Sequence, residues 1–134
     1  MKKHKKTLSL TLFSVCLWSN QAISSNICNI VRGSYVLAQD SSNTFLGTID
    51  NKFNAKSIFN EFGNYGSKYS SKSIWNDYGS FGGKYSSHSP FNNMSTTPPM
   101  IVKDNNIIGY LSSNKHISNS INPSILKAMC EDEI

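Results

Sequence analysis

Three aromatic residues recur at intervals of 16 positions, and each is followed directly by asparagine. They are Phe59-Asn60, Trp75-Asn76 and Phe91-Asn92. Sugar rings stack on aromatic faces and sugar hydroxyls pair with amide groups, so exposed pairs of this kind would form a ladder for glycan binding. The alternative is that the rings form the hydrophobic core and that the asparagines cap turns through their side chains.

Groups able to carry out catalysis are few. After residue 24 the chain has two histidines, His88 and His116, and neither has a Ser or Cys nucleophile in a recognisable setting. Glu61 and Asp77 lie one 16-residue interval apart, each in a unit that also holds lysine, so surface ion pairing explains them better than acid–base chemistry. The glycines near them lack the strand, helix and Lys-Ser/Thr of a phosphate-binding loop. We therefore predict a protein that is not an enzyme and has no catalytic residue and no cofactor.

Two cysteines, Cys28 and Cys130, lie near the two ends of the chain after residue 24. In an oxidising compartment a pair of this kind is typical of a disulfide, and the alternative is two free thiols. No second Cys or His lies at metal-ligand spacing from either one, which argues against a metal site. We predict a Cys28–Cys130 disulfide and no bound metal.

The 16-residue interval belongs to a tandem repeat. Residues 57–72 and 73–88 match at most positions, and a shorter third copy begins at Ser89. In the first unit Ser57 can cap a helical turn, and Ile58 and Phe62 have the i, i+4 spacing of one helix face. Gly63 can then end that turn in a left-handed conformation. The repeat therefore predicts short Ser-capped helical turns that bury their apolar faces against another element.

Residues 45–92 resemble an uncharacterised family of small exported bacterial proteins. Its members carry a Leu-Gly-x-Leu strand followed by tandem Ser-Ile-x-Asn-x-Tyr-Gly-x-Tyr-Gly-Ser-x-Tyr-Ser repeats. The matching residues are Leu46-Gly47-Thr48-Ile49, Ser57 to Ser70 and Ser73 to Ser86. In the third unit Met94-Ser95 replaces the aromatic-Gly step, so the match does not extend through a third copy. The resemblance implies export and this architecture, and it implies no activity.

Two pairs of β-branched and aromatic runs flank polar loops and predict two β-hairpins. The runs are 35–39 with 44–49, and 100–102 with 107–111. Gly47 and Gly109 in the second strands indicate bulges or close backbone contacts. Asn122 and Pro123 predict the start of a short final helix over 123–130. We therefore predict a small α+β domain at 25–134, with the first hairpin at 25–52, the repeats at 53–99, and the second hairpin and helix at 100–134. The alternative for 53–99 is a mostly irregular excursion.

Residues 1–24 have the pattern of a secretory signal peptide. Lysines at 2, 3, 5 and 6 precede the apolar run 7–18, and Ala22-Ile23-Ser24 places small residues at a cleavage site. The run is shorter than the roughly 20 residues that span a bilayer, which argues against a stable membrane span after cleavage. The alternatives are an uncleaved anchor, a core helix, and a lipoprotein acylated at Cys16.

The signal segment also accounts for the basic charge of the chain. Its four lysines leave nine Lys and Arg against eight Asp and Glu in the remainder, a net charge of +1. This near-neutral remainder lacks the charge that nucleic acids attract. We predict an exported protein of the periplasm or the extracellular space, acting as a non-catalytic structural or interaction protein. The alternative is a carbohydrate-binding module, so the candidate partners are an envelope protein and a cell-wall glycan.

Overall fold

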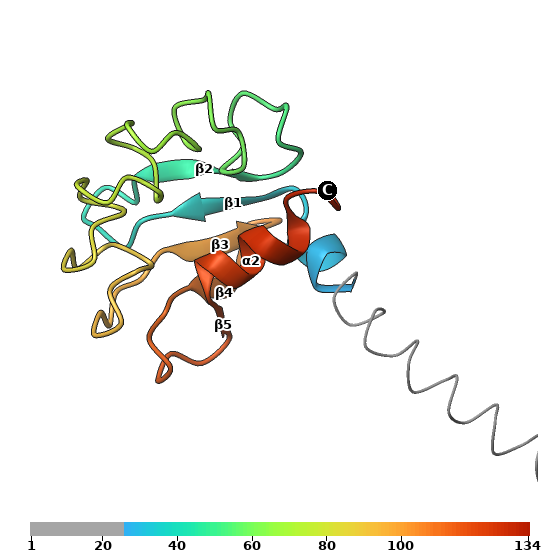
Figure 1. Cartoon of the computed structure of the whole chain (residues 1–134). Coiled ribbons are helices and arrows are strands. Elements are labelled where there is room, and N and C mark those ends of the chain that lie inside the picture. Colours follow the sequence, from blue (N-terminus) through green and yellow to red (C-terminus); the bar gives the residue numbers. More distant parts are fainter. Residues whose placement is uncertain (1–25) are drawn as a thin grey trace, which may run out of the picture.

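The computed structural model describes residues 26–134, so the predicted signal peptide at 1–24 lies outside the described residues. Five strands form one sheet in the order β2-β1-β3-β4-β5 (Figure 1). Their bounds are β1 (Ser34–Leu37), β2 (Phe45–Ile49), β3 (Met100–Lys103), β4 (Asn106–Leu111) and β5 (Ser120–Ile121). A short helix at 26–31 precedes the sheet, and α2 (Pro123–Cys130) follows it. The prediction of a small α+β fold is confirmed.

The strands pair antiparallel except at one edge. β1 lies between β2 and β3, β4 pairs with β3, and β5 runs parallel to β4. Asp104 and Asn105, both with positive φ, turn the chain from β3 to β4, as two-residue hairpins require. Between β1 and β2, Asp40 accepts hydrogen bonds from the Thr44 hydroxyl and backbone N–H, which lower the pKa of its carboxyl group.

Both predicted glycine irregularities are bulges. The register of β1 against β2 shifts beside Gly47, and that of β3 against β4 shifts beside Gly109. Gly47 has φ +110°, a conformation that other residues rarely adopt. After each bulged strand a later segment runs parallel beside it. Next to β2 this is a single bridge from Thr48 to Ser57, and next to β4 it is the strand β5.

The final helix begins as predicted. Asn122 is the N-cap of α2, and its side chain accepts hydrogen bonds from the backbone N–H groups of Ser124 and Ile125. Pro123 occupies the first turn, where its missing N–H costs nothing. Leu126 and Cys130 are buried on the face that packs against the rest of the domain.

Residues 51–95, which we call the turn chain, form consecutive β-turns rather than helical turns. From Asn51 to Gly63, every third backbone N–H donates to the carbonyl three residues before it, at 2.9–3.2 Å. Most residues that begin a turn are Asn or Ser, and their side chains accept from the N–H two residues ahead. Ser57 and Asn60, for example, accept from Phe59 and Phe62. These short side-chain contacts offer the backbone an alternative to the i→i−4 bonds of a helix.

The prediction of Ser-capped helical turns is therefore wrong. Ile58 is fully buried, whereas Phe62 is 97% exposed, so the two side chains do not share a face. The Ser57 hydroxyl does act as a local cap by accepting from the Phe59 N–H. The turn that it caps is a β-turn, which the Asn60 N–H closes by donating to the Ser57 carbonyl at 3.2 Å. The same arrangement recurs at Ser73 and again at Ser89, so the turns continue through the third unit as far as Ser95.

A one-residue insertion in each complete unit explains why the repeat is 16 residues long rather than 15. The N–H groups of Gly66 and Ser67 both donate to the Gly63 carbonyl, at 3.3 and 3.0 Å. Gly82 and Gly83 do the same with Gly79, at 3.4 and 2.9 Å. Four three-residue steps and one four-residue step therefore make one coil.

Replacing Gly66 or Gly82 by alanine should destabilise the domain by roughly 1–3 kcal/mol. A Cβ at either position would lie closer than 3.0 Å to the backbone oxygen of Asn60 or Asn76, a separation that real Cβ atoms essentially never show. Urea unfolding of each variant measures the loss. Ser80→Ala is the control, because Ser80 is exposed in the same unit. Equal midpoints for Gly82→Ala and Ser80→Ala would show that the insertion does not require glycine.

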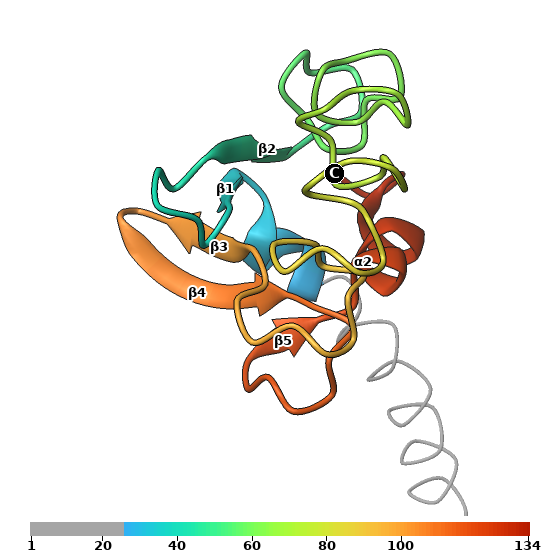
Figure 2. The same ribbon diagram turned by 90° about the vertical axis from the view of Figure 1, so that its left-hand side faces the viewer.

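The turn chain and α2 form a second layer against one face of the sheet (Figure 2). The core between the layers combines Val36, Leu46 and Ile101 from the sheet with Ile58 and Ile74 from the turn chain, and with Leu126 from α2. A disulfide between Cys28 and Cys130, 102 residues apart, joins the first helix to α2 and confirms the predicted pairing. The coils thus bury one side against the sheet and leave the other side to solvent.

Candidate functional site

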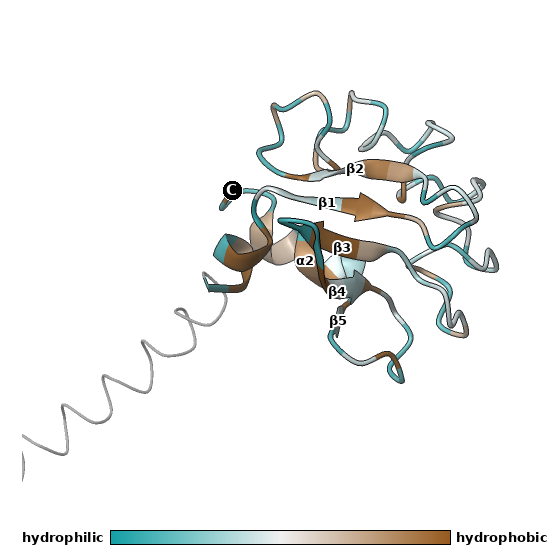
Figure 3. Cartoon of the chain, turned by 180° about the vertical axis from the view of Figure 1, so that it is seen from behind, coloured by the Kyte–Doolittle hydropathy of each residue, from teal (hydrophilic) through white to brown (hydrophobic). Residues whose placement is uncertain are grey.

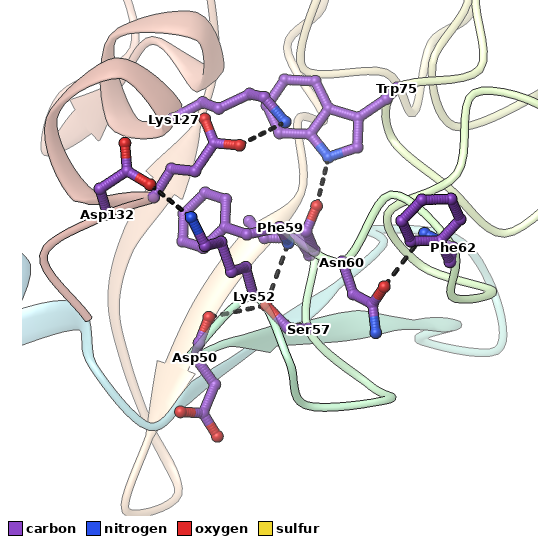
Figure 4. A network of polar contacts seen from close by, with 11 residues as sticks. Asp50, Lys52, Ser57, Phe59, Asn60, Phe62, Trp75, Lys127 and Asp132 are labelled. Atoms are coloured by element: carbon purple, nitrogen blue, oxygen red, sulfur yellow. Dashed lines mark hydrogen bonds and ion pairs between the residues drawn. The ribbon is translucent and has the colours of Figure 1, made fainter.

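The three recurring aromatic residues do not form a row of exposed rings. Phe59 is 1% exposed and belongs to the core, whereas Trp75 and Phe91 are half-buried with their ring centroids 5.7 Å apart. The indole N–H of Trp75 donates to the Ile58 carbonyl at 2.6 Å, which ties the second coil to the first (Figure 4). These rings mainly join successive coils, although Phe59 and Trp75 also line surface hollows.

The asparagines that follow these rings cap turns. Each side-chain oxygen accepts from the N–H two residues ahead, at 3.0–3.1 Å. Each side-chain NH₂ donates to the carbonyl six residues behind, also at 3.0–3.1 Å. Asn60, Asn76 and Asn92 therefore hold the backbone in the same way, with their amide groups largely occupied within the protein.

A different set of rings faces solvent. Phe53, Phe62, Tyr69, Tyr78 and Tyr85 are each at least 82% exposed. Each lies at the third position of a β-turn, which holds its backbone at an outward corner of the turn chain. Exposed large apolar side chains in such a series mark an interaction site more often than isolated ones do.

The residue before each exposed ring is charged, and the sign alternates along the chain. The pairs are Lys52-Phe53, Glu61-Phe62, Lys68-Tyr69, Asp77-Tyr78 and Lys84-Tyr85. By contrast, the turns that face the core carry apolar pairs, Ile58-Phe59, Ile74-Trp75 and Pro90-Phe91. The two central residues of a turn point to the same side of the chain, so each outward corner presents one charge and one ring together.

Three hollows lie between successive exposed rings. The first, of about 570 Å³, is lined by Lys52, Phe53, Phe59, Asn60, Glu61, Phe62 and Glu131. The second, of about 350 Å³, is lined by Glu61, Phe62, Gly66, Ser67, Lys68, Tyr69, Trp75 and Lys127. The third, of about 280 Å³, is lined by Lys68, Tyr69, Trp75, Asn76, Asp77 and Tyr78. Of the residues proposed from sequence for ligand binding, Phe91 and Asn92 line none of the three.

Two ion pairs lie where the hollows meet the C-terminal end of α2 and the residues after it. Lys52 pairs with Asp132 at 2.7 Å, and this hydrogen bond and the carboxylate charge raise the pKa of Lys52. Lys127 pairs with Glu131 at 3.5 Å, and its Nζ lies 4.8 Å from the centroid of the Trp75 ring. Figure 4 shows both lysines beside the Phe59 and Trp75 rings. Each lysine is thus held in place next to a hollow.

The described residues offer little for other chemistry. Among them, no three His, Cys, Asp or Glu side chains are grouped so that they could hold a metal ion. His88 is half-buried, His116 is exposed, and in this part of the chain neither ring makes a hydrogen bond. Within 26–134 every helix is too short or too polar to cross a bilayer.

Comparison with known proteins finds no relative: the sequence matches no protein-family model, no curated protein and no solved structure.

Proposed function

We propose that this chain is an exported, non-catalytic binding protein and that its ligand is a glycan bound along the outer side of the turn chain. The observation that supports this most is the series of exposed rings alternating with hollows. Aromatic faces suit the apolar faces of sugars, and carboxylate and ammonium groups suit their hydroxyls. The binding residues in this proposal are Phe53, Phe62, Tyr69 and Tyr78, with Trp75 at the floor.

Export is part of this proposal and has separate support. The predicted signal peptide at 1–24 would direct the chain out of the cytoplasm. The Cys28–Cys130 disulfide is compatible with an oxidising compartment such as the periplasm or the extracellular space. A glycan of the cell wall or cell surface is the ligand that such a protein would meet.

Binding of the mature protein to purified cell wall tests the proposal. Tyr69→Ala should weaken binding about tenfold, because Tyr69 is 92% exposed and lines two hollows. Tyr85→Ala is the matched control, since Tyr85 holds the equivalent position one unit later, is 88% exposed and lines none of the three hollows. Equal loss in both variants, or no binding by the wild-type protein, would refute the proposed site.

A second candidate function is contact with an envelope protein through the other face of the sheet. Figure 3 shows this face, over which no described helix lies, and the turn chain reaches it at the β2 edge, where the Tyr65 ring packs against Phe45 at 5.1 Å. Strand alternation places apolar side chains on it, namely Tyr35, Leu37, Phe45, Met100 and Tyr110, all partly exposed. Antiparallel sheets usually place polar residues on a solvated face. A photo-crosslinker at Met100 should then capture an envelope protein, whereas one at exposed Ile125 of α2 should not.

A further inference from the structure

We infer that the three hollows form one groove that binds an uncharged, extended glycan chain, and this inference rests on the proposed function. The hollows adjoin one another because neighbouring ones share lining residues. Glu61 and Phe62 line the first and the second, and Lys68, Tyr69 and Trp75 line the second and the third. An extended ligand that passes over these shared residues would contact all three hollows.

The succession of exposed rings along the hollows favours a ligand that itself consists of repeated rings. Phe53, Phe62, Tyr69 and Tyr78 follow one another in the sequence, and each hollow is bounded by two successive members of this set. A polymer of sugars presents an apolar face at regular intervals, so successive units can meet successive rings. A short glycan would occupy one hollow and gain only part of the contact.

The charges along the groove favour a ligand without net charge. Lys52, Lys68 and Lys127 are matched by Glu61, Asp77 and Glu131, so the lining is neutral as a whole. An acidic polymer would bring carboxylates against the three acids, and a basic polymer would bring cations against the three lysines. Hydroxyl groups can donate to the acids and accept from the lysines, so an uncharged sugar chain fits every position.

Three of these charged groups are available for such contacts. Among the described residues, Glu61, Lys68 and Asp77 form no ion pair and no side-chain hydrogen bond, and each adjoins an exposed ring. Lys52 and Lys127 are instead oriented by Asp132 and Glu131. The groove therefore combines two lysines that are paired with acidic residues just after α2 with three unpaired charged groups of the turn chain.

The test uses the mature protein and defined oligosaccharides. Cello- and N-acetylchito-oligosaccharides serve as uncharged probes, oligogalacturonates as acidic probes and chitosan oligosaccharides as basic probes, each as disaccharide and hexasaccharide. We expect binding of an uncharged hexasaccharide at least about tenfold tighter than of its disaccharide and of the charged hexasaccharides. Its affinity should change less than about twofold between low and high salt, because no net charge is neutralised. Tyr69→Ala should lose this preference, and Tyr85→Ala should keep it.

The possible results separate the inference from the proposed function. Preference for an acidic or a basic glycan, or equal affinity for disaccharide and hexasaccharide, would overturn the inference of an uncharged extended ligand while leaving glycan binding in place. Failure of every glycan probe, together with no binding to purified cell wall, would overturn both. Selective binding of an uncharged hexasaccharide that Tyr69→Ala abolishes would support both.

Discussion

Replacing Cys28 and Cys130 together by serine should lower the free energy of unfolding by about 4 to 5 kcal/mol, the chain-entropy value for a loop of 102 residues. That is a large share of the net stability of a small domain. The bond joins the first helix to α2 near the two ends of the described chain, so its loss removes the covalent link between these two elements. Chemical denaturation of the oxidised wild-type protein and of the double variant measures the difference.

Reduction provides the control for this prediction. A reducing agent should destabilise the wild-type protein by a similar amount and leave the double-serine variant unchanged. If the variant unfolds at the same denaturant concentration as the oxidised wild type, the stability of the domain comes from the sheet and the turn chain alone, and the disulfide does not contribute to it.

Phe59→Ala should cost about 3 to 5 kcal/mol of stability, whereas Phe62→Ala should cost less than about 0.5 kcal/mol. The two residues have the same side chain and lie three positions apart. Phe59 is buried among the core residues at 1% exposure, and Phe62 is 97% exposed. Truncation of the first leaves a cavity, and truncation of the second removes almost no packing.

Denaturant unfolding of both phenylalanine variants also distinguishes β-turns from the helical turn that the i, i+4 spacing favours. In a helical turn Phe62 would share a buried face with Ile58, and both phenylalanine variants would be unstable. The β-turns predict that only Phe59→Ala is unstable and that Phe62→Ala is affected in glycan binding. Similar losses of stability in the two variants would contradict the β-turn conformation of the turn chain.

Much of the sheet and of α2 could be predicted because their signals are local. β-branched and aromatic runs mark the four longer strands, and Gly47 and Gly109 mark the bulges. Asn122 and Pro123 set the start of α2 from its first turn alone. The disulfide was predicted from an even pair of cysteines in a chain expected to reach an oxidising compartment. Apart from the disulfide, which joins residues 102 positions apart, these features do not depend on how distant segments pack.

The path of the repeats could not be inferred from the 16-residue period alone. The i, i+4 spacing of Ile58 and Phe62 favours a helix, but a second pattern competes with it. Asn51, Asn54, Ser57, Asn60 and Gly63 place a turn-forming residue at every third position. Because each Asn or Ser side chain closes its own turn, the three-residue spacing determines the backbone.

The β-turn to which an aromatic residue belongs, rather than its residue type, determines whether its ring faces solvent. The signal that distinguishes them is the preceding residue, which is charged before Phe62 and Tyr78 and apolar before Phe59 and Trp75. The ligand-binding residues predicted from sequence were chosen by their period alone, and both kinds of ring share that period. The hollows themselves also require α2, which contributes Lys127 and the neighbouring Glu131 from far along the chain.

The fluorescence of Trp75 reports directly on whether the groove is occupied, because Trp18 lies in the predicted signal peptide and leaves Trp75 as the single tryptophan of the mature chain. Trp75 lines the second and third hollows, so an uncharged hexasaccharide in the groove must cover it. We predict a saturable change in its emission and reduced quenching by acrylamide in the wild-type protein and in Tyr85→Ala, but not in Tyr69→Ala. Unchanged quenching of the wild-type protein with both cellohexaose and N-acetylchitohexaose would contradict the proposed groove.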